Sequence, residues 1–89
     1  MTFSVLVEIT LRRGVADPQG ATIERSLPAL GVEGVRDVSV GKAVRFHVDA
    51  PDEATARARV EDLCQRFLAN PVIEDTAVTM EAVTMEASA

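Results

Sequence analysis

The alternation of apolar and polar residues near the N-terminus, with Leu6 as its one exception, constrains this fold more than any other feature. Apolar side chains occupy every second position of the first strand-like segment, at Phe3, Val5, Val7, Ile9 and Leu11. Because strand side chains point alternately to the two faces of a sheet, this pattern predicts a strand with one face buried. The following Arg-Arg-Gly run at residues 12–14 is expected to end it.

A helix is expected after this strand. Asp17 can cap it by accepting backbone N–H bonds, and Pro18 suits the first helical position. Gly31 is expected to stop the helix, and Pro28, which lacks an N–H, to kink or loosen it earlier. Gly20 is a costly choice for a first turn, by roughly 1 kcal/mol against alanine. We therefore expect another part of the chain to pack close to the Gly20 backbone.

Two short alternating segments then predict a β-hairpin. Residues 38–40 and 44–48 carry apolar side chains at every second position, and Gly41-Lys42 lies between them. A short turn containing glycine is typical of hairpins. The same dipeptide could hold a phosphate through a backbone N–H and an ammonium group, but it lacks the glycine-rich loop of a phosphate-binding motif. The hairpin turn is the preferred interpretation.

A second helix and a final strand complete the pattern. Asp52 and Glu53 place carboxylates at the positive end of the helix. Its apolar face follows the 3.6-residue period through Ala56, Val60, Leu63, Cys64 and Phe67. Asn70 suits a left-handed C-terminal cap, and Pro71 prevents continuation of the helix. Residues 72–80 are predicted to form the last strand.

The predicted order is therefore β-α-β-β-α-β in a chain of the α+β class. This order commonly closes as a four-stranded antiparallel sheet with two helices on one face, the ferredoxin-like plan. A single domain is expected over residues 1–82. The segment Ala-Val-Thr-Met-Glu occurs at 77–81 and again at 82–86. Because five is an odd period, Val78 and Val83 should face opposite sides of a straight strand. Residues 83–89 are expected to be a flexible tail, or to pair with another chain.

Size and charge limit the functions open to this chain. At 89 residues it forms one small domain that buries a modest fraction of its surface, so a partner is expected to cover part of it. The net charge of −5 argues against binding a nucleic-acid backbone. One cysteine excludes an internal disulfide and a cysteine-based zinc site. The N-terminus lacks a basic region followed by an apolar stretch, so a cytoplasmic location is expected.

No catalytic, cofactor-binding or metal-binding residue is expected on this chain. His47 is the only histidine and is interpreted as a solvated or interface residue on a strand. Cys64 lies on the apolar face of the second helix, where cysteine usually behaves as a small hydrophobe. Glu74 and Asp75 are adjacent, so on a strand they point to opposite sides and cannot share a proton. The acidic residues do not cluster at the spacing of a metal-binding loop.

The joint between the second helix and the last strand is more specified than folding requires. It reads Leu-Ala-Asn-Pro-Val-Ile-Glu-Asp at residues 68–75. The helix is expected to end here without a glycine, and two carboxylates, Glu74 and Asp75, follow. This joint, with Asp-Pro-Gln-Gly at 17–20 and Gly-Lys at 41–42, resembles PurS. PurS is the small subunit of bacterial formylglycinamide ribonucleotide amidotransferase, also called phosphoribosylformylglycinamidine synthase. The resemblance covers residues 3–81, with an unusual Pro28 and a lengthened tail.

The resemblance implies a non-catalytic assembly subunit that forms a dimer or higher oligomer. Its family works with a large ATP-dependent synthetase subunit and a glutaminase subunit in de novo purine biosynthesis. The complex is an ATP-dependent C–N ligase with glutamine as amido donor, and it uses ATP and Mg²⁺. The small subunit is expected to bridge the other two and to assist ammonia transfer, without a cofactor of its own.

The positions expected to contact partners or to shape joints are Asp17, Pro18, Gln19, Gly20, Gly41, Lys42, Asn70, Pro71 and Glu74. Two other functions remain open from the residues alone. The first is a ferredoxin-like regulatory module that binds an amino acid or a nucleotide. The second is an RNA-binding module, which would need exposed aromatic residues on central strands and a basic face.

Overall fold

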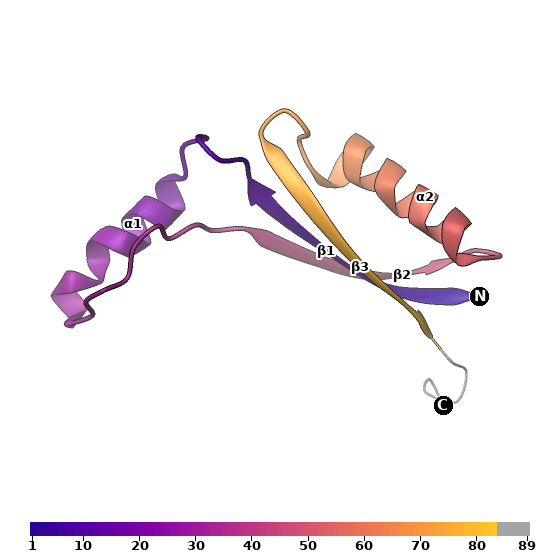
Figure 1. Cartoon of the computed structure of the whole chain (residues 1–89), viewed down its shortest axis with the longest axis horizontal. Coiled ribbons are helices and arrows are strands. Elements are labelled where there is room, and N and C mark those ends of the chain that lie inside the picture. The colour runs from indigo at the N-terminus through magenta and orange to yellow at the C-terminus, as the bar shows by residue number, and fades with distance from the viewer. Residues whose placement is uncertain (84–89) are drawn as a thin grey trace.

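The computed structural model describes residues 1–83 as a three-stranded sheet, one helix packed on it and a helical arm that extends away (Figure 1). In chain order, the elements are β1 (Thr2–Leu11), α1 (Pro18–Ser26), η1 (Pro28–Leu30), β2 (Lys42–Asp49), α2 (Glu53–Leu63), η2 (Cys64–Leu68) and β3 (Glu74–Val83). No helix in this described part is long and apolar enough to cross a membrane.

β1 is the central strand of an antiparallel sheet in the order β2-β1-β3. The predicted alternation is confirmed, because Phe3, Val5, Val7 and Ile9 are each at most 2% exposed. Val5 pairs with Phe46 on one side and with Met80 on the other. α2 covers this face, and the main cluster of buried residues consists of Val5, Val7, Ile9, Val60 and Cys64.

Within residues 1–83 the sheet has three strands and residues 38–40 are not one of them, so the hairpin prediction is wrong. Residues 38–40 belong to no strand and lie along α1. The N–H of Val38 donates to Glu24 Oε1 at 3.0 Å, and the N–H of Val40 donates to Asp17 Oδ2 at 2.8 Å. These side-chain carboxylates take two N–H groups that would otherwise bond to a neighbouring strand. The α+β class is therefore correct, but the sheet has three strands.

α1 does not lie on the face that α2 covers, which corrects the prediction of two helices on one face. Figure 1 shows α1 beyond the end of the sheet, at the far end of a projecting arm formed by residues 15–40. The expected loosening at Pro28 is confirmed, because α1 ends at Ser26 and a short 3-10 turn begins at Pro28. Gly31 ends that turn with φ +77°, in the left-handed region that favours glycine.

α2 begins as predicted and ends differently. The Asp52 carboxylate caps it by accepting from Thr55 N at 2.7 Å. After Leu63 the helix widens into a π turn, with Ala69 N bonded to Cys64 O five residues back. A π turn holds one residue more than an α turn, so the side chains after it shift around the helix axis. Leu68 packs against the core, whereas Phe67 is 79% exposed, so the prediction that Phe67 lies on the buried face is wrong.

β3 begins at Glu74, two residues later than predicted, and runs to Val83. Val78 pairs with the buried Val7, and Val83 pairs with Thr2 on the other face. The register thus confirms that the two copies of the repeat point to opposite faces. Val83 belongs to the strand and not to the expected tail, and the prediction for residues 84–89 lies outside the described part of the chain.

The molecule is far from globular. Its radius of gyration is 17.3 Å and its extents are 51 × 33 × 16 Å, whereas a compact domain of this length has a radius of gyration of about 12 Å. Its accessible surface is 6661 Å², against roughly 5,000 Å² for a compact monomer of this mass. An arm without a core of its own accounts for this shape. The chain therefore has more surface to cover than its own core can provide.

Candidate subunit interface at the junction of arm and sheet

Most of the positions singled out in the sequence line one groove where the arm meets the sheet. The groove has a volume of about 340 Å³. Its lining comes from the end of β1, the start of α1, the start of β2 and the start of β3: Ile9, Leu11, Asp17, Pro18, Gln19, Val40, Gly41, Lys42 and Glu74. Segments that are more than 50 residues apart in the chain thus meet at one place.

Asp17 holds the arm together from two directions. One carboxylate oxygen accepts from Gly20 N at 2.9 Å and caps α1, as predicted. The other oxygen accepts from Val40 N at 2.8 Å, across 23 residues of chain. These two bonds, first to Gly20 and then to Val40, hold the pKa of Asp17 below its ordinary value and outweigh the smaller opposing effect of burial. The ionised carboxylate is therefore the form that keeps the arm closed.

Gly20 and Gly41 are places where two backbones approach closely. A Cβ on Gly20 would collide with the carbonyl oxygen of Val38, which confirms that another segment packs against this glycine. A Cβ on Gly41 would lie 2.6 Å from the carbonyl oxygen of Ile9. Gly41 is not in a hairpin turn; it lets the chain pass over the end of β1 before β2 begins at Lys42. Both glycines therefore set the geometry of the groove.

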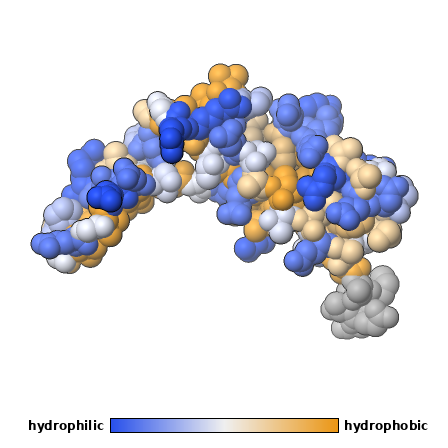
Figure 2. Space-filling model, in the orientation of Figure 1, coloured by the Kyte–Doolittle hydropathy of each residue, from blue (hydrophilic) through white to orange (hydrophobic). Residues whose placement is uncertain are grey.

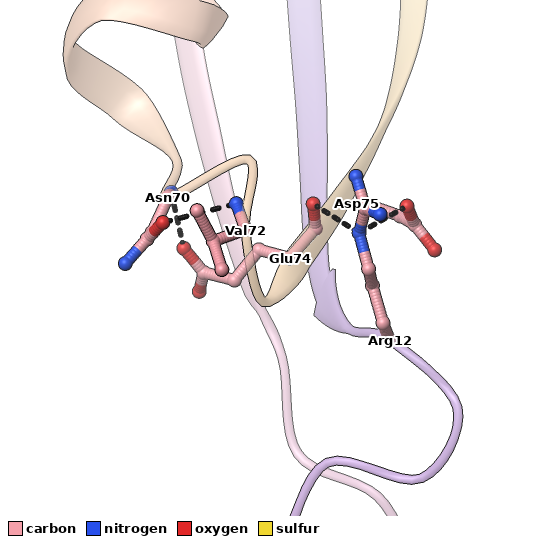
Figure 3. Close-up of polar contacts among 5 residues, drawn as sticks. All are labelled: Arg12, Asn70, Val72, Glu74 and Asp75. Carbon is pink, nitrogen blue, oxygen red and sulfur yellow. Dashed lines mark hydrogen bonds and ion pairs between the residues drawn. The ribbon is translucent and has the colours of Figure 1, made fainter.

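The joint before β3 is closed by reciprocal bonds between Asn70 and Glu74 (Figure 3). Asn70 N donates to Glu74 Oε1 at 2.7 Å, and Asn70 O accepts from Glu74 N at 2.8 Å. Asn70 Oδ1 also accepts from Val72 N at 3.0 Å, which makes an Asx turn around Pro71. Asn70 is not the left-handed cap that we predicted, because Asp37 is the one non-glycine residue with positive φ in the described part of the chain.

Arg12 ties the end of β1 to the same joint, a role that the sequence did not indicate. Its Nε lies 3.3 Å from Asp75 Oδ1 and 3.5 Å from the Glu74 carbonyl oxygen, and its own N–H donates to Ile73 O at 2.8 Å. Figure 3 shows the side chains of Glu74 and Asp75 pointing apart, as expected for adjacent strand residues. Pairing between segments 62 residues apart leaves no periodic signal in a sequence.

The described residues do not assemble a reactive group. Cys64 is buried; burial raises the pKa of its thiol, and the Glu61 carboxylate adds to that rise. The buried thiol is thus held away from its nucleophilic thiolate form. His47 lies on β2, opposite Ser4 of β1, and is exposed. Within residues 1–83, no group of three or more His, Cys, Asp or Glu side chains is placed to hold a metal ion.

The positions singled out in the sequence divide into those that shape the backbone and those that line the groove. Asp17, Gly20, Gly41, Asn70 and Glu74 act on the backbone of their own chain. Pro18, Gln19 and Lys42 line the groove with side chains that a partner could contact. Sequence reasoning missed Glu24 and Arg12, which pair over long distances, and the exposed Phe67, whose position depends on the π turn.

Comparison with known proteins agrees with this geometry. The family model PurS, phosphoribosylformylglycinamidine (FGAM) synthase, matches residues 4–82. The PurS subunit of Methanothermobacter thermautotrophicus is 42% identical over 80 residues, which are 90% of this chain and 94% of that protein. The PurS subunit of Synechocystis is 39% identical over 77 residues, covering 86% of this chain and 77% of that protein.

Solved structures give the same assignment. Methanocaldococcus jannaschii PurS, one of the subunits of formylglycinamide ribonucleotide amidotransferase, superposes with a TM-score of 0.81 at 34% identity, over 92% of this chain and 99% of that one. A chain of the PurLQS structure from Thermotoga maritima superposes with a TM-score of 0.84 at 31% identity, over 91% and 99%. Sequence, fold and site geometry together show that the chain belongs to the PurS family of phosphoribosylformylglycinamidine synthase.

Proposed function

We propose that this chain is a non-catalytic assembly subunit of phosphoribosylformylglycinamidine synthase in purine biosynthesis. The complex uses ATP and glutamine to convert formylglycinamide ribonucleotide to the amidine. In this proposal the chain joins the synthetase and glutaminase subunits and assists the transfer of ammonia between them. The observation that carries the proposal is an extended molecule whose apolar side chains are exposed at two separate places.

The first exposed apolar surface lies on the arm and the second on the joint. The arm surface consists of Ile23, Leu30, Val32 and Val35, which are 40–74% exposed. The joint surface consists of Phe67, Val72 and Ile73, which are 37–79% exposed. Figure 2 shows both as orange areas, one along the lower edge of the arm and one over the turn before β3. Apolar surface of this kind marks places where proteins associate.

The area of the molecule leaves room for both contacts. The surface exceeds that of a compact monomer by roughly 1,600 Å². A standard interface buries about 800 Å² on each partner. The excess is therefore what two interfaces of ordinary size would cover. We propose that the arm surface mediates self-association to a dimer or tetramer and that the joint contacts another subunit.

The lack of an assembled reactive group in residues 1–83 supports a structural role. In this proposal the chain carries no catalytic residue and no cofactor, and the other subunits hold ATP and Mg²⁺. The acidic charge of −5 suits a soluble subunit that works beside anionic substrates without binding them. We expect it in the cytoplasm with the other subunits.

Reconstitution tests this proposal directly. The synthetase and glutaminase subunits from the same organism are assayed for amidine formation with and without this chain, using glutamine or ammonia as the nitrogen source. We expect the chain to restore turnover with glutamine and to show no glutaminase or synthetase activity alone. Full glutamine-dependent activity of the two partners without this chain would contradict the proposal.

The family assignment does not favour the regulatory module. The groove is near the lower size limit of small-molecule sites, which are roughly 300–1,000 Å³. Its two carboxylates are both bonded to backbone N–H groups of the chain itself. Calorimetry with amino acids and nucleotides would detect such binding, and we expect none at micromolar concentration.

A further inference from the structure

The π turn at the end of α2 exposes an aromatic residue that a regular helix would bury. Val60 and Cys64 mark the buried face of α2. Continuing the α-helical period from these residues brings Phe67 onto the same face. The i→i+5 bond from Ala69 N to Cys64 O, at 3.0 Å, inserts one extra residue, and Leu68 packs against the core instead. The turn therefore places a partly buried leucine against the core where a regular helix would place Phe67.

This exposure is unusual within the chain itself. The sequence has three phenylalanines and no tryptophan or tyrosine. Phe3 is 2% exposed and Phe46 is half-buried, whereas Phe67 is 79% exposed. Val72, on the turn that follows, is 78% exposed. π turns occur often at functional sites, and aromatic side chains are enriched in the cores of protein interfaces.

The charged side chains beside these apolar residues are paired within the chain. Arg66 Nη2 lies 2.9 Å from Asp62 Oδ2, and Arg12 Nε lies 3.3 Å from Asp75 Oδ1. Glu74 accepts the N–H of Asn70. A partner that covers this surface therefore meets charges that already have a counter-charge, and it does not need to supply one. The chemistry that fits this surface is apolar.

We propose that Phe67, with Val72, is the anchor by which this chain docks onto a different subunit of its complex, inserting the ring into an apolar pocket on that subunit. This inference rests on the proposed assembly function and names the contact that the joint makes. A second copy of this chain is not the occupant, because the arm provides a separate apolar surface and the excess area suffices for two interfaces.

The test compares two neighbouring exposed residues on the same π turn. Binding of the full-length chain to the purified partner subunits is measured by calorimetry for wild type, Phe67→Ala and Arg66→Ala. We expect Phe67→Ala to weaken binding at least tenfold, as for an anchoring aromatic. Arg66→Ala should stay within about twofold, because its charge already pairs with Asp62. Sedimentation and thermal unfolding of Phe67→Ala should match wild type, since the ring is outside the core.

The possible outcomes separate this inference from the function beneath it. Wild-type chain that fails to bind the partner subunits would overturn the proposed function. Wild-type binding with an unchanged affinity for Phe67→Ala would overturn the anchor alone. A change in the self-association of Phe67→Ala, with unchanged binding to the other subunits, would identify a second copy as the occupant and would also overturn the inference.

Discussion

At the scale of single residues, Asp17 is the side chain on which the arm depends. It caps α1 and also binds the returning segment at Val40. The two bonds do not compete, because each uses a different carboxylate oxygen. Glu24 makes a similar contact, because its carboxylate accepts the N–H of Val38. Two acidic side chains therefore accept the backbone N–H groups of the returning segment, as a neighbouring strand would in a sheet.

Replacing Asp17 by asparagine should loosen the returning segment and leave α2 intact. The amide nitrogen that replaces one oxygen cannot accept from Val40 N. We expect faster hydrogen exchange at Val40 and unchanged exchange at Thr55, whose cap Asp52 is separate. Amide exchange followed by NMR measures both. Equal protection of Val40 in wild type and variant would contradict this role.

The same bond should make the arm sensitive to acid. The pKa of Asp17 lies below its ordinary value of 3.8 in the folded chain, so its contribution to stability is present above that value. It is lost as the pH falls below 3.8 and through the lower folded pKa. The protection of the Val40 amide, measured relative to its intrinsic exchange rate at each pH, should therefore fall in this range in the wild type. Asp17→Asn should lack that fall.

Gly20→Ala should destabilise the chain although alanine is the better helix former. On an open helix position this change stabilises by up to about 1 kcal/mol. Here the new Cβ would collide with the backbone carbonyl of Val38. We expect a lower midpoint in chemical unfolding than wild type. A higher midpoint would contradict this prediction, because it would show that the Val38 backbone can move away from the methyl group without loss of stability.

At the scale of elements, the joint before β3 is closed by hydrogen bonds and an ion pair of its own. Asn70 and Glu74 close it, and Arg12 fastens it to the end of β1. The π turn that precedes it decides which side chains face outward. Because Leu68 and Ala69 pack on the core, the joint has a defined position relative to the sheet.

The double variant Asn70→Ala with Pro71→Ala should impair assembly more than folding. It removes the Asx turn, and the loss of one exposed hydrogen bond costs about 1 kcal/mol. The position of Phe67 and Val72 should become less defined, so we expect a larger loss in affinity for the partner subunits. Chemical unfolding and calorimetry on the same samples give the two values. Equal losses in the free energy of unfolding and in the free energy of binding would show that the joint has a purely structural role.

At the scale of the whole molecule, one small core supports a much larger surface. The buried hydrophobic residues among those described lie in β1, in the loop before α2, in α2 and at the start of η2, whereas the arm has only the buried Gly20. A molecule of this shape gains most of its further stability by association. An extended subunit with apolar surface at both places is suited to connecting other proteins.

Leu30→Asp should shift self-association without unfolding the chain. Leu30 is 74% exposed on the arm, so a charge there is tolerated in the monomer. In a contact between arms the same charge would be buried without a partner, at a high cost. Sedimentation should show a smaller species, with an unchanged circular dichroism spectrum. The same sedimentation as wild type would exclude the arm as the contact surface.

The sequence by itself determined the central strand, both helix starts and the family. Residues 3–9 alternate with the single exception of Leu6, Asp17 and Asp52 are caps with short-range partners, and the joint at 68–75 has a specific composition. These features depend on neighbours within a few residues, so a local pattern can reveal them.

Only the tertiary structure decided the number of strands, the position of the arm and the exposure of Phe67. Residues 38–40 have the alternation of a strand, yet Asp17 and Glu24 take their N–H groups from 23 and 14 residues away. Phe67 has the period of a buried residue, yet core packing of Leu68 and Ala69 favours a π turn. In both cases competing long-range contacts outweigh a local preference, and no local pattern records which one prevails.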